Sequence, residues 1–300
     1  MFSGQAPAPP RWAKGRGPGW SRKGQALGGT DPDATVARVS SRAVSDGGPD
    51  GLYVLASGPA GDLPIVLVHG GLDRSASFGR MARRLGDIPL LRYDRRGYGR
   101  SAGVPVGPLP VHVDDLLGLL DQPSVVFGHS VGGVVALAAA QRRPDRVSAV
   151  VAYEPPLPWL DWWPRDGDAL DDPGDEAERF MRRMVGDRIW ERLPAATRQA
   201  RREEGPALRA DIDSLERGGP AFDPASIAVP VIVAHGSETT WWHRRAVEEL
   251  ASTIPGAVAR EVSEAGHGIH LSHPREAAEL AIEGREAARL DQADRAHRGA

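Results

Sequence analysis

The sequence VVFGHSVGGVVALAAA, residues 125–140, decides the fold of this chain. It begins as a short apolar run, is interrupted by Gly128-His129-Ser130-Val131-Gly132, and continues as an apolar, alanine-rich run. The first run is typical of a buried parallel strand, and the second of a buried helix. The small residues around the serine relieve the crowding of a very tight turn. We therefore predict a strand that turns sharply into a helix at Ser130.

Ser130 is the candidate nucleophile. In open α/β sheets, ligands bind at the carboxyl ends of the strands, which is where such a turn would hold the serine hydroxyl. The backbone N–H of Val131, at the start of the helix, would face the same space. A serine before a helix can also be a simple N-cap. The strand before it and the helix after it favour the nucleophile.

Further strand-like segments predict a mostly parallel, doubly wound sheet with an antiparallel edge. Residues 35–44 and 51–58 alternate in polarity, as an exposed hairpin does. The other candidate strands are PIVLVHG, IPLLRYD, SVVFGH, RVSAVVAYE, VPVIVAHG and GAVAREVSEAGH. Helices are predicted for residues 75–85, 111–120, 131–143, 240–254 and 274–283.

The chain divides into a core, an insertion and two tails. A long gap in the strand pattern carries Trp159, Trp162, Trp163 and Trp190, so we predict a helical cap insertion at residues 155–228. The core then comprises residues 35–154 and 229–286. Residues 1–34 are basic and rich in Gly and Pro, which predicts a disordered tail. Residues 287–300 are predicted to be a C-terminal tail, the frayed end of a helix.

Composition excludes several classes of function. The net charge of −3 gives no indication of a nucleic-acid partner. The chain has no cysteine, which excludes disulfides, thiolate metal sites and a cysteine nucleophile. No apolar run is long enough to span a membrane. We expect a small-molecule substrate, no nucleic-acid or membrane partner and, because no secretory signal is evident, a cytoplasmic protein. The oligomeric state stays open.

A serine hydroxyl needs a base, and His267 is the candidate. It lies in SEAGHGIHLSHP, directly after the last predicted strand, on a glycine-flanked loop. His69 is followed by two glycines, which indicates a turn, and His129 should point away from the serine. The spacing of His267, His270 and His273 could suggest a metal site, but a loop that enters a helix does not place three residues on one face. We therefore predict no metal site.

The acid that orients the histidine is ambiguous. Glu154 ends one predicted strand, in SAVVAYE, and Glu238 follows the next, in VIVAHGSETT. Asp94 also ends a strand, but the glycine- and arginine-rich turn after it suggests a carboxylate bonded to its own loop. The residues alone do not decide whether Glu154 or Glu238 is this acid.

Four motifs together resemble those of the α/β-hydrolase fold family, over residues 35–283. They are HGG at residues 69–71, DRRGYGRS at 94–101, GHSVGG at 128–133 and GHGIHLSHP at 266–274. The resemblance implies an eight-stranded α/β-hydrolase fold with a cap, Ser130 as nucleophile and His267 as base. It also implies an oxyanion hole made by the N–H groups of Val131 and of Gly71 or Leu72.

The sequence departs from this family after the seventh strand. Members usually carry an aspartate there, where HGSETT has Thr239, with Glu238 one residue before. Some members, such as the haloalkane dehalogenases, place the acid after the sixth strand, which corresponds to Glu154. We favour Glu154 as the acid. Dehalogenase and epoxide hydrolase chemistry are disfavoured, because those enzymes use an aspartate where this chain has Ser130.

The resulting hypothesis is a serine hydrolase without a cofactor, similar to a carboxylesterase. It would cleave an ester, thioester or lactone through an acyl-enzyme. Trp159, Trp162, Trp163 and Trp241 are predicted to line an apolar substrate pocket, although buried tryptophans could equally serve cap packing. Three alternatives stay open: hydrolysis of a carbon–carbon bond, a cofactor-free haloperoxidase-like activity, and a non-catalytic hydrolase fold that only binds a ligand.

Overall fold

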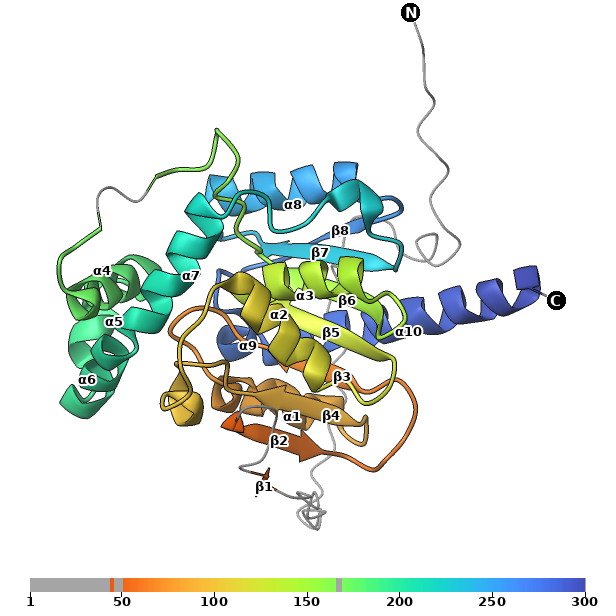
Figure 1. Ribbon diagram of the computed structural model, residues 1–300, viewed down its shortest axis with the longest axis horizontal. Coiled ribbons are helices and arrows are strands. Elements are labelled where there is room, and N and C mark those ends of the chain that lie inside the picture. The colour runs from red at the N-terminus through yellow and green to blue at the C-terminus, as the bar shows by residue number, and fades with distance from the viewer. Residues whose placement is uncertain (1–43, 46–50, 166–168, 300) are drawn as a thin grey trace, which may run out of the picture.

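The computed structural model describes residues 44–45, 51–165 and 169–299. In this part of the chain, eight strands form one sheet in the order β1-β2-β4-β3-β5-β6-β7-β8 (Figure 1). The strands are β1 (Val44–Ser45), β2 (Val54–Ser57), β3 (Ile65–Val68), β4 (Leu90–Tyr93), β5 (Ser124–His129), β6 (Val147–Tyr153), β7 (Val231–Gly236) and β8 (Val258–Val262).

The sheet is mostly parallel with an antiparallel edge, which confirms the predicted fold class. β2 pairs antiparallel with both β1 and β4, and all later neighbours pair parallel. β3, β5 and β7 are buried along their whole length. Their continuous apolar runs therefore reflect helices on both faces of the sheet.

Two layers of helices cover the sheet (Figure 1). One apolar cluster packs α2, α3 and α8 against one face, and a second packs α1, α9 and α10 against the other. The helices of these two layers are α1 (Gly79–Leu85), α2 (Leu109–Gly118), α3 (Val131–Arg142), α8 (Trp241–Thr253), α9 (Ile269–Ser272) and α10 (Pro274–Gly299). α3 is rich in alanine and buried throughout its apolar length, so it packs closely on the middle of the sheet.

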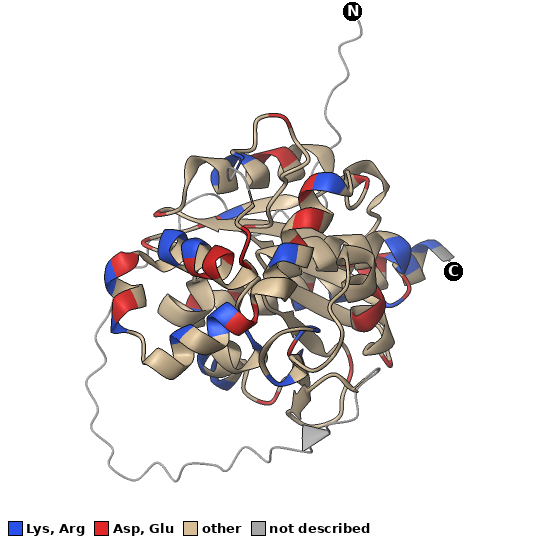
Figure 2. Ribbon diagram, turned by 60° about the vertical axis from the view of Figure 1, so that its left-hand side comes forward, with Lys and Arg blue, Asp and Glu red and all other residues tan. Residues whose placement is uncertain are grey.

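The segment between β6 and β7 contains helices α4 to α7, which gather at one side of the molecule (Figure 1). They are α4 (Pro173–Val185), α5 (Asp187–Arg192), α6 (Ala195–Glu203) and α7 (Gly205–Arg217). Acidic and basic residues occur together on these helices (Figure 2), and many pair, as Arg202 does with Asp175 and Glu178. This helical segment lies within the predicted insertion.

A buried ion pair joins this segment to the rest of the protein. Arg95, in the loop after β4, donates two hydrogen bonds to Asp211 of α7, at 3.0 and 2.7 Å. Tyr98 and His112 also contact the Asp211 carboxylate. Burial alone would raise the pKa of Asp211, but the charge and hydrogen bonds of Arg95 and His112 hold it far below its usual range. Asp211 is therefore an anion that fixes α7 over the loop after β4.

The predicted C-terminal tail falls within the last helix. α10 continues to Gly299, so residues 287–299 are the end of this helix. Ala287 and Ala288 are buried, which explains why the helix continues beyond Glu283. The predicted disordered tail, residues 1–34, and most of the first predicted strand lie outside the described residues. Among the described helices, none is both long and apolar enough to cross a membrane.

Candidate active site

Ser130 occupies a strained turn between β5 and α3. Its backbone has φ 53° and ψ −125°, a conformation that residues other than glycine rarely adopt. A Cβ atom at Gly128 would collide with the Gly132 carbonyl, and one at Gly132 with the Val68 carbonyl. The glycines are therefore required by close backbone approach, as the sequence predicted. The turn holds Ser130 at the carboxyl end of β5.

His267 and Glu154 are joined by a short hydrogen bond. Nδ1 of His267, in the loop after β8, lies 2.7 Å from Oε2 of Glu154, directly after β6. The backbone N–H of Gly236, at the end of β7, donates to Oε1 of the same carboxylate at 2.9 Å. Glu154 is fully buried and has a positive φ of 47°. Three strand ends thus fix the carboxylate, and in the described part of the chain no hydrogen bond engages Nε2 of the imidazole.

The Glu154 carboxylate is an anion. Burial alone would raise the pKa of Glu154, but the hydrogen bond and charge of His267, then His243 and the Gly236 N–H, lower it to about 2. Because an ionised carboxylate can only accept hydrogen bonds, Nδ1 of His267 carries the proton. This arrangement orients an imidazole so that Nε2 can accept a proton from a hydroxyl.

His243 is a second histidine at the same carboxylate, and sequence reasoning missed it. Its Nδ1 lies 3.5 Å from Glu154 Oε2, and its ring stacks on His267 with centroids 4.7 Å apart and planes 16° apart. Burial, then the charge of His267, lowers the pKa of His243 to about 3 despite the nearby carboxylate. His243 is therefore neutral and supports the face of His267. Its place in the first turn of α8, within WWHRR, gave no signal of this contact.

Glu238, the alternative acid, lies elsewhere. It lines the same cavity but is exposed, and its backbone N–H donates to the Ala265 carbonyl. Within the described residues, no hydrogen bond or ion pair joins its side chain to His267. Asp94 accepts a hydrogen bond from the backbone N–H of Arg100 in its own loop, as expected, and another from the N–H of Ser75 in the segment after β3.

Backbone groups of two segments border the same space. Val131 is the first residue of α3, so its N–H has no acceptor within the helix. Gly71 lines the cavity beside Ser130 and Val131. Leu72 is buried, with a positive φ of 51°. Gly71 and Leu72 follow β3, which is adjacent to β5 in the sheet.

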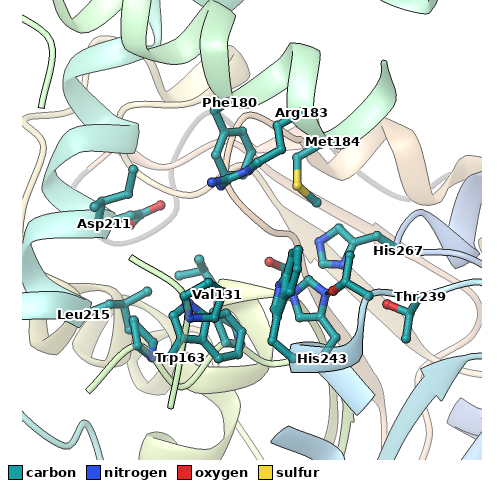
Figure 3. A pocket seen from close by; sticks show the side chains of 18 of the residues that line it. Val131, Trp163, Phe180, Arg183, Met184, Asp211, Leu215, Thr239, His243 and His267 are labelled. Carbon is teal, nitrogen blue, oxygen red and sulfur yellow. Dashed lines mark hydrogen bonds between the residues drawn. The ribbon is translucent and has the colours of Figure 1, made fainter. Parts of the chain in front are cut away.

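Ser130 and His267 line one cavity of about 440 Å³. Figure 3 shows Phe180, Arg183 and Met184 of α4 across the cavity from Val131, Trp163 and His243. Leu208 and Ile212 of α7 add further apolar surface. The helical segment between β6 and β7 thus forms much of the wall opposite the strand ends.

Of the four tryptophans predicted to line the pocket, one contributes to the wall of this cavity. Trp163 lines the cavity, and Trp242 does so in addition. Trp159 instead packs edge-on against Phe222, and Trp162 packs against Trp163 and the Arg245 guanidinium. Trp241 is 55% exposed, outside the cavity wall. Phe180 and Met184 supply the apolar wall instead, and the sequence showed them only as part of an ordinary amphipathic helix.

The sequence of this chain matches a known protein family. The family model described as the alpha/beta hydrolase family matches residues 65–280, most of the described core and the helical segment within it. The chain belongs to the alpha/beta hydrolase family. This match confirms the family resemblance, and membership supports a hydrolase.

Individual proteins resemble this chain over part or most of its length. Lipase LipV of Mycobacterium tuberculosis is 37% identical over 108 residues, which cover 35% of this chain and 41% of that relative. Esterase YbfF of Escherichia coli is 26% identical over 239 residues, which cover 70% of this chain and 88% of YbfF. The enol-lactonase structure from Burkholderia xenovorans superposes with a TM-score of 0.61, 23% identity, and coverage of 79% of this chain and 98% of that one. At that identity, the structural likeness supports the fold alone.

Proposed function

We propose that this protein is a serine hydrolase that cleaves a small, partly apolar ester, thioester or lactone through an acyl-enzyme. Ser130 is the nucleophile, His267 the general base and Glu154 the acid that orients it. The observation that carries this proposal is the 2.7 Å bond between His267 and Glu154, on the wall of the cavity that Ser130 also lines.

The proposed reaction has two half-steps. Ser130 Oγ attacks the substrate carbonyl carbon while its proton passes to His267 Nε2. His267 then protonates the leaving alcohol or thiol as the carbon–oxygen or carbon–sulfur bond breaks. A water molecule next attacks the acyl-enzyme and gives its proton to His267. Collapse of the second intermediate releases the carboxylic acid and restores Ser130.

Backbone donors would stabilise the oxyanion of each half-step. The Val131 N–H at the start of α3 is one candidate donor, and the N–H of Gly71 or Leu72 after β3 is the other. Such donors act strongly because they are fixed before the charge develops. The positive φ of Leu72 supports a loop held in one conformation for this purpose.

The cavity favours a substrate of limited size. A volume of about 440 Å³ is at the small end of ligand pockets. Phe180, Met184, Leu208 and Trp163 give it an apolar wall, which suits an acyl chain or a ring. We propose that the helical segment at residues 155–228 acts as the cap. Names of relatives as lipase and esterase agree with ester cleavage.

A substrate panel tests this function. Wild type and the Ser130→Ala variant are assayed with p-nitrophenyl esters of rising chain length, with simple lactones and with an aryl thioester. We expect wild type to hydrolyse short or medium acyl groups and Ser130→Ala to retain less than about a thousandth of that rate. Cleavage of a vinylogous diketone alone, with no ester or lactone turnover, would instead favour a carbon–carbon bond hydrolase.

A further inference from the structure

A second group of ionisable side chains lies next to the candidate active site. Asp73, His129 and His270 each offer a donor atom, and these atoms lie within 4.8 Å of one another. Asp73 follows Leu72, His129 precedes Ser130, and His270 lies in the loop of His267. Neither the proposed mechanism nor the family match gives this group a role.

Asp73 and His270 form a close pair inside the group. Asp73 Oδ2 lies 3.1 Å from His270 Nε2, an ion-pair distance, and within the described residues neither atom has a further hydrogen-bond partner. Two donors bound to one metal ion at about 2.0–2.1 Å in tetrahedral geometry lie roughly 3.3 Å apart. The separation therefore suits two atoms that point to a common third position.

The tautomer of His129 presents a lone pair to that position. Its Nε2 lies 2.8 Å from the carbonyl oxygen of His267, and because a carbonyl only accepts, Nε2 carries the proton. Nδ1 is then unprotonated, and it is a buried atom without a partner in the described part of the chain. A histidine that donates one ring N–H to a backbone carbonyl and binds metal through the other nitrogen is the usual arrangement at metal sites.

Burial of polar atoms without hydrogen bonds in this group destabilises the folded state. The relative exposure is 6% for His129 and 1% for His270. Buried polar atoms in folded proteins are nearly always bonded to protein, water or an ion. Glu154, His243 and His267 form a comparable group, but there the carboxylate already accepts hydrogen bonds from His267 and Gly236. In the first group, Asp73 Oδ2 and His270 Nε2 have their mutual contact, and His129 Nδ1 has no hydrogen-bond partner in the described residues.

We propose that Asp73 Oδ2, His129 Nδ1 and His270 Nε2 bind one divalent transition-metal ion of the zinc type, with water as fourth ligand. Two imidazoles and one carboxylate form a donor set that zinc accepts. The ion would tie together the loop after β3, the Ser130 turn and the His267 loop. Its expected effect is to stabilise the fold, and the proposal does not depend on the hydrolytic reaction.

Metal titration of the full chain tests the proposal. Protein with its purification tag removed is stripped with a chelator and titrated with zinc chloride by calorimetry, and with cobalt chloride by visible absorption. We expect one zinc per chain, a cobalt spectrum of four-coordinate type and a rise in melting temperature with zinc. Asp73→Asn and His270→Gln should each weaken zinc binding at least 100-fold.

Two matched variants control for other histidines. His273→Gln changes a nearby histidine outside the group, and His243→Gln disrupts the second group; both should bind zinc as wild type does. Absence of zinc binding by folded wild type would overturn the proposal and leave a buried water as the partner of these atoms. Binding that survives in Asp73→Asn and His270→Gln but is lost in His243→Gln would also overturn it. Circular dichroism establishes that each variant is folded. Asp73→Asn keeps the size and shape of the side chain, which is partly exposed, so this variant should fold.

Discussion

Glu154 Oε2 lies 2.7 Å from His267 Nδ1, although 113 residues separate the two positions. The sheet explains the approach, because β6 and β8 both lie next to β7 and run parallel to it. The residues that follow parallel strands meet at one edge of the sheet. The helical segment is inserted between β6 and β7 and leaves this edge intact. It can therefore form part of the cavity wall without displacing His267 or Glu154.

Replacing Glu154 separates the two candidate acids. Glu154→Gln should lower kcat for a p-nitrophenyl ester by roughly 10³–10⁴-fold, because the imidazole loses its orienting anion and its correct tautomer. Glu238→Gln is the matched control and should stay within about threefold of wild type, since the Glu238 side chain is exposed. Steady-state kinetics measure both. The opposite order of effects would make Glu238 the functional acid.

The low pKa of Glu154 predicts a pH-dependent stability. Its folded pKa of about 2 lies below the ordinary value of 4.5, so the folded state binds fewer protons between these values. The stabilising contribution is complete above pH 4.5 and is lost as pH falls toward 2. Urea unfolding of wild type and Glu154→Gln at pH 7, 4 and 3 measures it. The difference between their free energies of unfolding, about 3 kcal/mol at most, should decrease as the pH is lowered. A difference that stays constant with pH would contradict a lowered pKa of Glu154.

His243 should act by supporting His267. His243→Ala removes both the ring stack and the contact with Glu154, so we expect a kcat about tenfold lower, near 1.4 kcal/mol. His243→Phe keeps an aromatic face and should recover part of that loss. Because His243 also lines the cavity, KM is measured alongside kcat. A change in KM alone would show that His243 serves substrate binding and not the position of His267.

The Arg95–Asp211 pair should matter for stability. Asp211→Asn leaves a fully buried guanidinium without its anion, which costs about 3–5 kcal/mol. Asp213→Asn, two residues away, removes only a surface pair with Arg217 and should cost less than about 0.5 kcal/mol. Urea unfolding compares the two. Similar midpoints for both variants would mean that the buried pair does not hold α7 to the core.

Much of the fold could be predicted because local patterns agreed with it. The apolar runs of β3, β5 and β7 have no polar alternation, which is typical of strands covered on both faces. Gly128 and Gly132 marked the turn at Ser130, because only glycine tolerates such close backbone contact. His267 was evident from its place after the last strand.

Side-chain direction in irregular segments could not be predicted. Trp159 and Phe180 are both apolar residues of the inserted segment, yet Trp159 packs on Phe222 while Phe180 lines the cavity. Composition cannot distinguish these orientations, which are set by how the helices between β6 and β7 pack. His243 and Asp73 were missed for a related reason: their partners come from distant segments, with no fixed spacing in the sequence.

Covalent labelling shows whether Ser130 is an activated nucleophile. Wild type is incubated with a fluorophosphonate probe, and the modified peptide is identified by mass spectrometry. We expect stoichiometric modification of Ser130, loss of labelling in Ser130→Ala and strongly slowed labelling in His267→Gln. Folded wild type that does not react with the probe, or reacts equally after Ser130→Ala, would contradict the account of Ser130 as an activated nucleophile.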